Sequence, residues 1–230
     1  MKVKVLATDV DGTLTDKNYK ISLEAVKYLR ILEEKGFPII LVSGNALCTL
    51  KTLQRYLGCS GALIAEDGAV VEYKDKLKIL GDNTEAKKAL KKLKEKFGEL
   101  IVESWTNPYR YVDIAILRTV NKNEILEVIQ EFSNLKLLDS GFAYHLVDKN
   151  IDKGKGLKVA AQLMGFKLEE VAVVGDSETD LEMFKVAGLR FALANAPKNL
   201  KNLADYVTSK EDGEGFAEVA KRILGEKEIG

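Results

Sequence analysis

Two aspartates, Asp9 and Asp11, stand one residue apart in the segment Asp-Val-Asp-Gly-Thr, directly after an apolar run. This position puts two carboxylates at the end of a predicted buried strand, and Gly12 opens the turn that follows. Carboxylates at the carboxyl end of a buried strand cost free energy unless a bound ion or a reaction uses them. The pair therefore predicts a metal site, a reacting group, or both.

A second acidic cluster, Asp176 and Asp180, also follows an apolar run, at residues 171–174. The carboxyl ends of parallel strands meet at one edge of a sheet, so the two clusters are expected to converge there. Oxygen ligands of this kind suit a hard cation such as Mg²⁺. The sequence thus predicts a magnesium site built from both ends of the chain.

The elements that position these residues alternate between apolar runs and segments of helical periodicity in the first and last thirds of the chain. Fully apolar strands joined by helices are typical of a parallel sheet that is covered on both faces. We therefore expect an α/β core with a doubly wound parallel sheet. The predicted strands cover residues 3–7, 38–42, 62–65, 171–174 and 189–193.

Residues 82–150 show a different order of helix, two strands, helix and two strands, which is typical of an α+β layer with an antiparallel sheet. The strands are expected near residues 100–104, 111–118, 136–138 and 142–147. The sequence therefore predicts a core of residues 1–81 and 151–230, an inserted cap of residues 82–150, and a catalytic cleft between them.

Composition excludes several classes of protein. Basic and acidic residues number 35 each, whereas nucleic-acid and membrane-surface binders normally carry a basic excess. No apolar stretch approaches the ~20 residues of a membrane span, and no signal peptide is recognisable, which predicts a cytoplasmic protein. Cys48 and Cys59 are expected as reduced thiols, with a bridge between them as the alternative. The lysine-rich charged surface is typical of thermophiles, and both a monomer and a homodimer are compatible with the sequence.

Four segments in order resemble the motifs of the haloacid dehalogenase-like (HAD) phosphatases. They are Asp-Val-Asp-Gly-Thr at 9–13, Ser43 after Leu-Val, Lys153 in Asp-Lys-Gly-Lys-Gly, and Gly-Asp-Ser-Glu-Thr-Asp at 175–180. An insert between the second and third motifs is similar to the C2-type cap of the Cof-like branch. The short chain and small cap resemble the archaeal phosphoglycolate phosphatase group most.

This resemblance implies a Mg²⁺-dependent phosphomonoester hydrolase that works through an aspartyl-phosphate. Asp9 would be the nucleophile, and Asp11 the general acid and base. The residues implied in binding the metal are Asp9, Asp11 through its backbone carbonyl, Asp176 and Asp180, and those implied in binding the phosphoryl group are Ser43, Gly44 and Lys153. The substrate would be a small phosphorylated metabolite, with 2-phosphoglycolate as the first expectation.

Alternative functions remain open at this point. A sugar-phosphate phosphatase is the second expectation, and a phosphosugar mutase or phosphotransferase would share the aspartyl-phosphate. A receiver-like signalling module also uses a metal-bound acidic cluster and a phospho-aspartate, although it needs neither a large cap nor a carboxylate at Asp11.

Several residues also have purely structural interpretations. Asp9 and Asp11 could form an ordinary turn, Asp176 and Ser43 could cap helices, Asp180 could face solvent or support Asp176, and Lys153 could be solvated. Three weaker candidates for substrate contact are Arg110, suited to a carboxylate, His145, the only histidine, and Asn195. For these, a surface loop, a hydrogen-bonded histidine and a turn-forming asparagine are the alternatives.

The sequence departs from the family pattern at two places. Thr179 stands before the last aspartate of the fourth motif, where the Cof-like branch often has asparagine. Glu66-Asp67-Gly68 stands where that branch often has Asn-Gly, which would alter the loop below the cap. Neither departure affects the nucleophile.

Overall fold

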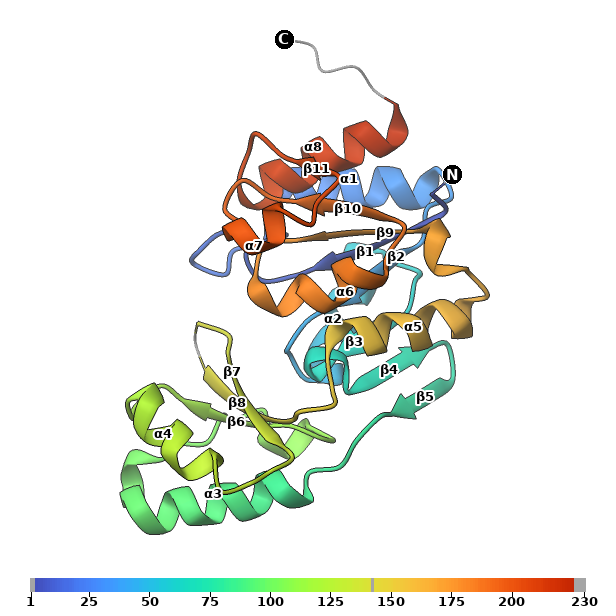
Figure 1. Cartoon of the computed structure of the whole chain (residues 1–230). Coiled ribbons are helices and arrows are strands. Elements are labelled where there is room, and N and C mark those ends of the chain that lie inside the picture. The colour runs from blue at the N-terminus through green and yellow to red at the C-terminus, as the bar shows by residue number, and fades with distance from the viewer. Residues whose placement is uncertain (1–2, 142, 226–230) are drawn as a thin grey trace.

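The computed structural model describes residues 3–141 and 143–225. Its main element is an eight-stranded sheet with the strand order β11-β10-β9-β1-β2-β3-β4-β5 (Figure 1). The strands from β11 to β3 run parallel, and β4 and β5 are antiparallel additions. In chain order they are β1 (Val5–Asp9), β2 (Ile39–Val42), β3 (Leu63–Ala65), β4 (Val70–Tyr73), β5 (Lys76–Ile79), β9 (Val171–Gly175), β10 (Leu189–Ala192) and β11 (Tyr206–Val207).

Helices cover both faces of this sheet. One face packs against α1 (Leu23–Glu34), α2 (Leu47–Leu57) and α8 (Asp212–Leu224), and the other against α5 (Lys153–Met164), α6 (Leu181–Val186) and α7 (Lys198–Lys201). Successive strand residues alternate between the two hydrophobic clusters, with Leu6 in the first and Val5 and Ala7 in the second. Because both faces are covered, the central strands are apolar throughout. The expected doubly wound α/β core is confirmed.

A second, smaller layer lies below the large sheet in Figure 1. It contains α3 (Thr84–Phe97), β6 (Ile114–Leu117), α4 (Lys122–Ile129), β7 (Leu135–Asp139) and β8 (Ala143–Asp148). The strands form an antiparallel sheet in the order β6-β8-β7, and the two helices pack against it around a separate hydrophobic cluster. We propose on this basis that residues 82–150 form the cap and that residues 1–81 and 151–230 form the core.

Some elements differ from those that the sequence pattern predicts. The strand expected at residues 100–104 is replaced by a 3₁₀ turn, Gly98–Leu100, and an isolated bridge from Glu103 to Ile116. Pro108 lies in the 3₁₀ turn that follows, Asn107–Tyr109, and lacks the N–H that a longer strand pairing requires. Short elements such as β5, α7 and β11 carry too few residues for a periodic signal.

Two expectations fall on particular side chains. Phe142, where the last cap strand was expected to begin, lies outside the described residues. Cys48 and Cys59 are both free thiols, exposed and buried respectively, so the alternative of a bridge between them is wrong. Burial, with the nearby Glu33 carboxylate, raises the pKa of Cys59 to about 12. Within the described ranges, no helix is both long and apolar enough to cross a membrane.

Candidate active site

The carboxyl edge of the parallel sheet brings the separate sequence motifs together. Asp9 is the last residue of β1, and its register partner on β2 is Val42, which directly precedes Ser43. Strand β9 pairs with the other side of β1 and ends at Gly175, so Asp176 follows at the same edge. Helix α5 begins there with Lys153 as its first residue, where the side chain of Asp152 caps it by accepting the N–H of Lys155 at 2.8 Å.

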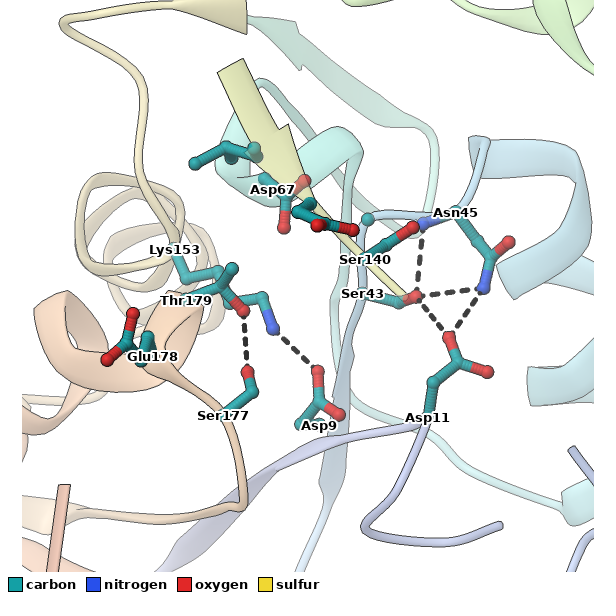
Figure 2. A pocket seen from close by; sticks show the side chains of 13 residues that line it. Asp9, Asp11, Ser43, Asn45, Asp67, Ser140, Lys153, Ser177, Glu178 and Thr179 are labelled. Atoms are coloured by element: carbon teal, nitrogen blue, oxygen red, sulfur yellow. Dashed lines mark hydrogen bonds and ion pairs between the residues drawn. The ribbon is translucent and has the colours of Figure 1, made fainter. Parts of the chain in front are cut away.

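A cavity of about 230 Å³ opens at this edge (Figure 2). Core and proposed cap both contribute to its wall, because three consecutive cap residues at the end of β7 face the core motifs. The lining residues are Asp9, Asp11, Ser43, Gly44, Asn45, Asp67, Leu138, Asp139, Ser140, Lys153, Ser177, Glu178 and Thr179. Drug-sized ligands occupy pockets of roughly 300–1,000 Å³, so this cavity suits a smaller molecule.

Lys153 is the cation of the site. Its Nζ lies 2.6 Å from Asp9 Oδ1 and 2.7 Å from Asp180 Oδ1, and the side chain is 2% exposed. Burial alone would lower the pKa of Lys153, but the carboxylates of Asp180, Asp9 and Asp67 outweigh burial and hold it well above its ordinary value. The ammonium group is therefore charged, and the alternative of a solvated lysine is wrong.

The carboxylate of Asp9 is buried, with the whole residue 4% exposed. Burial raises the pKa of Asp9 well above its ordinary value, Lys153 opposes this rise, and the carboxylates of Asp180, Asp176 and Asp11 add to it. Four acidic side chains around one buried ammonium leave an excess of negative charge. Such an arrangement favours the binding of a further cation.

Asp176 is held by two side chains that donate hydrogen bonds to it. Thr13 Oγ1 donates to Oδ1 at 2.9 Å, and Asn195 Nδ2 donates to Oδ2 at 3.1 Å and to the Gly12 carbonyl at 2.9 Å. Gly12 has a φ of +85°, and a Cβ there would lie 2.4 Å from Asp176 Oδ2, so only glycine fits. Burial and the Asp180 carboxylate raise the pKa of Asp176 to about 7.

Asp180 is fully buried, and both of its oxygens accept hydrogen bonds. Oδ1 meets Lys153, while Oδ2 accepts the backbone N–H groups of Asp176 and Ser177, each at 3.0 Å. These bonds fix the turn that carries Asp176 and Ser177 at the end of β9. The contacts favour the supporting role for Asp180, and the alternative in which it faces solvent is wrong.

The residues at this edge fit a magnesium ion. Oxygens of Asp9, Asp176 and Asp180 lie within 4.8 Å of one another. Carboxylate oxygens are the ligands that Mg²⁺ prefers, and Mg²⁺ usually keeps several waters, so one or two protein carboxylates suffice. Asp180 is fully buried and holds Lys153 and the turn after β9, whereas Asp176 is only half-buried, so Asp9 and Asp176 are the carboxylates best placed to hold the ion.

Asp11 turns toward the segment that follows β2. Its Oδ2 accepts hydrogen bonds from Asn45 Nδ2 at 2.9 Å and from Ser43 Oγ at 3.3 Å (Figure 2). Burial raises the pKa of Asp11, against the lowering effects of Lys153 and of these two hydrogen bonds. A carboxyl group with a raised pKa holds its proton to a higher pH and can deliver it to a leaving group.

Arg110 and His145, which the sequence suggested as substrate contacts from the cap, do not line the cavity. Arg110 does not line the cavity, and its guanidinium is buried: Nη1 lies 2.6 Å and 2.7 Å from the two carboxylate oxygens of Asp113 and donates to the Gly44 carbonyl at 3.0 Å. His145 is also fully buried, between Asp113 and Ser140. Arg110 is therefore neither at the cavity wall nor in an exposed surface loop, and His145 is the hydrogen-bonded histidine of the alternative interpretation.

Glu66 connects the core to the same cap segment. It is fully buried, and its carboxylate accepts the backbone N–H groups of Tyr111 at 2.9 Å, Val112 at 2.8 Å and Asp113 at 3.1 Å. Glu66 and Asp67 both have positive φ, 52° and 53°, which is uncommon for residues other than glycine. The segment Glu66-Asp67-Gly68, which stands where the Cof-like branch often has Asn-Gly, therefore joins the core to the proposed cap through the Glu66 carboxylate.

We expect the Glu66→Gln substitution to weaken the pH dependence of stability. Burial and the Asp113 carboxylate raise the pKa of Glu66 from 4.5 to about 7. The folded state thus holds this proton more tightly than the unfolded state, so the wild type loses stability as pH rises from 4.5 through 7, by up to about 3 kcal/mol. Glutamine cannot ionise, so the variant should lose less over this range.

Urea unfolding at pH 5 and pH 7.5, in EDTA, measures this difference. Glu34→Gln, on the exposed surface of α1, is the matched control and should follow the wild type. Equal pH dependence in the wild type and Glu66→Gln would show that Glu66 is ionised throughout.

Several residues that line the cavity or support its acidic groups were not anticipated from the sequence. Asn45 follows the second motif directly, and its position in the turn after β2 was the available signal. Thr13 belongs to the first motif, but its contact with Asp176 depends on β1 and β9 being neighbours. No sequence pattern marked Asp67 or Ser140 as a residue of the site, because their approach to it depends on how the core and the proposed cap meet.

Comparisons with known proteins agree with this geometry. The chain matches the haloacid dehalogenase-like hydrolases over residues 6–107 and 114–219. A phosphoglycolate phosphatase from Methanothermobacter thermautotrophicus is 41% identical over 223 residues, covering 97% of this chain and 100% of that protein. Another from Archaeoglobus fulgidus is 40% identical over 226 residues, covering 97% and 98%. A solved structure from Thermoplasma acidophilum has a TM-score of 0.90 and 26% identity, covering 97% and 99%. This chain therefore belongs to the haloacid dehalogenase-like hydrolases, as a phosphatase that acts on phosphate monoesters.

Proposed function

We propose that this phosphatase hydrolyses 2-phosphoglycolate to glycolate and phosphate, through a phosphorylated Asp9 and with the help of Mg²⁺. The observation that carries the reaction is the ion pair between Asp9 and the buried Lys153, in a cavity that Asp11 also lines. The substrate is inferred from the relatives, of which the two most similar ones described above are phosphoglycolate phosphatases. The small volume of the cavity agrees with a small substrate.

In the first step, a carboxylate oxygen of Asp9 attacks phosphorus, and the bond from phosphorus to the glycolate oxygen breaks. Asp11 gives its proton to that oxygen, so glycolate leaves as the alcohol rather than as an alkoxide. Lys153 stabilises the negative charge on the phosphoryl oxygens, and the Ser43 hydroxyl and the Gly44 N–H are placed to donate to them. The product of this step is an acyl phosphate on Asp9.

In the second step, a water oxygen attacks the same phosphorus atom. Asp11, now ionised, takes a proton from this water, and the bond between phosphorus and Asp9 breaks. Phosphate leaves, and both aspartates return to their initial states. Asp11 therefore serves once as acid and once as base, which explains why a receiver-like role would not require it.

Mg²⁺ bound to Asp9 and Asp176 would supply positive charge that keeps Asp9 ionised and reduces its repulsion of the phosphate anion. Thr13 and Asn195 hold Asp176 in the orientation that this requires. Asp180 keeps Lys153 beside Asp9 and fixes the turn that carries Asp176.

Phosphate release from a panel of small phosphomonoesters tests this proposal. The panel contains 2-phosphoglycolate, ethyl phosphate and several sugar phosphates, each with Mg²⁺ and with EDTA. We expect metal-dependent multiple turnover, with the highest kcat/KM for 2-phosphoglycolate. A higher kcat/KM for a sugar phosphate would replace the proposed substrate. Transfer of phosphate to a sugar hydroxyl instead of water would identify a mutase or phosphotransferase.

A further inference from the structure

The cap side of the cavity offers one neutral polar side chain. Leu138, Asp139 and Ser140 form this wall. The carboxylate of Asp139 forms ion pairs with two cations, because Arg118 Nε lies 3.6 Å from one of its oxygens and Lys122 Nζ lies 3.8 Å from the other. Ser140 follows β7 directly and is solvent-exposed, so its hydroxyl group can meet a molecule that enters the cavity (Figure 2).

The buried imidazole of His145 lies within hydrogen-bond distance of the Ser140 hydroxyl group. The imidazole is fully buried, with Nδ1 2.6 Å from Asp113 Oδ2 and Nε2 3.2 Å from Ser140 Oγ. An ionised carboxylate only accepts hydrogen bonds, so Nδ1 carries a proton. Ser140 Oγ also lies 3.1 Å from the Ala143 carbonyl, an acceptor to which the hydroxyl donates. With its proton directed to Ala143, the Ser140 oxygen lies against Nε2 of the ring.

Asp113 and Arg110 connect His145 to the core loop at Gly44. Burial would raise the pKa of Asp113, but the hydrogen bond from His145 and the charge of Arg110 hold it below its ordinary value. Arg110 also donates to the Gly44 carbonyl in the core. Glu66 accepts the N–H of Asp113. Ser140 is thus connected through buried ion pairs to the loop that meets the phosphoryl group.

We propose that Ser140, oriented by His145, determines specificity by donating a hydrogen bond to the carboxylate of the substrate. Rotation of the hydroxyl group away from Ala143 lets it donate into the cavity while its oxygen stays within hydrogen-bond distance of His145 Nε2. A hydroxyl donor at this point of the wall favours a substrate that presents an acceptor such as a carboxylate there. His145 is a positioning residue in this arrangement. The inference rests on the proposed function, because it requires a substrate with a carboxylate beside the phosphate.

The test compares 2-phosphoglycolate with ethyl phosphate, which has the same chain length but no carboxylate. In Ser140→Ala, kcat/KM for 2-phosphoglycolate should fall about 10- to 100-fold, whereas kcat/KM for ethyl phosphate should stay within about twofold of the wild type. Most of the change should lie in KM. Ser140→Thr keeps a hydroxyl and should retain most of the preference, and Ser133→Ala, on the exposed surface of the cap, should behave like the wild type.

His145→Gln tests the positioning role. Glutamine can hydrogen-bond to Ser140 but lacks the rigid ring that contacts Asp113 and Ser140 together, so we expect an intermediate loss of preference for 2-phosphoglycolate and unchanged ethyl phosphate hydrolysis. An equal fall for both substrates in Ser140→Ala, or no fall, would overturn the inference while leaving the proposed function intact. Failure of the wild type to prefer 2-phosphoglycolate over ethyl phosphate would overturn both.

Discussion

Turnover by the Asp9→Asn variant is expected to be at least about 10⁴-fold slower than that of the wild type, because an amide cannot replace the carboxylate as nucleophile. The substitution is expected to remove the nucleophile while it keeps the local hydrogen bonding. An asparagine oxygen can still accept the hydrogen bond that Lys153 makes to Asp9 Oδ1 at 2.6 Å. Phosphate release under saturating substrate and Mg²⁺ measures the effect.

The stability of Asp9→Asn separates loss of chemistry from loss of structure. The raised pKa of Asp9 means that ionising this carboxylate among its acidic neighbours costs free energy in the folded state. Removing the charge should therefore leave the metal-free protein as stable as the wild type at pH 7, or more stable. An active variant would exclude Asp9 as nucleophile, and an unfolded variant would show that its carboxylate is structural.

Lys153→Met is expected to reduce both activity and stability. Removing the ammonium leaves the buried carboxylates of Asp9 and Asp180 without their cation, and breaking a buried ion pair costs about 3–5 kcal/mol. Loss of the positive charge at the phosphoryl group should lower kcat by roughly 10²–10³-fold, as for other lost electrostatic donors. Urea unfolding in EDTA and phosphate release with Mg²⁺ measure the two effects.

Lys158→Met is the matched control, because Lys158 lies on the same helix, α5, but is exposed. It should differ little from the wild type in either measurement. If Lys153→Met were as stable as the wild type, the carboxylates around it would have to be protonated or solvated in the folded state. Asp9→Asn and Lys153→Met are thus expected to change stability in opposite directions, although both remove a charge from the same ion pair.

Local sequence determined the parts of this protein whose signals lie within a few neighbouring residues. The apolar runs predicted the central strands because a strand buried on both faces needs apolar residues throughout. Ser22 caps α1 by accepting the N–H of Ala25, and Gly58 ends α2 in the left-handed conformation, which are roles that these residue types commonly fill. The acidic motifs could be placed at one edge because strand ends in a parallel sheet share that edge.

Tertiary structure decided what each polar side chain does at that edge. Asp180 could have faced solvent or a metal, and the proximity of Lys153 and of the Asp176 N–H sets its supporting role. Arg110 carries the same charge in a loop or in a buried pair, and only the approach of Asp113 and Gly44 distinguishes the two. Such contacts join residues far apart in sequence, so no local pattern encodes them.

The junction between core and cap shows the same limit most clearly. Glu66 and Ser140 belong to no motif, yet one holds the cap segment through three backbone N–H groups and the other lines the cavity. Sequence by itself determined the fold class, the phosphatase class and the motif residues that meet at one edge of the sheet. The tertiary structure decided which side chains of residues 82–150 line the cavity, because this depends on how that segment packs against the rest of the chain.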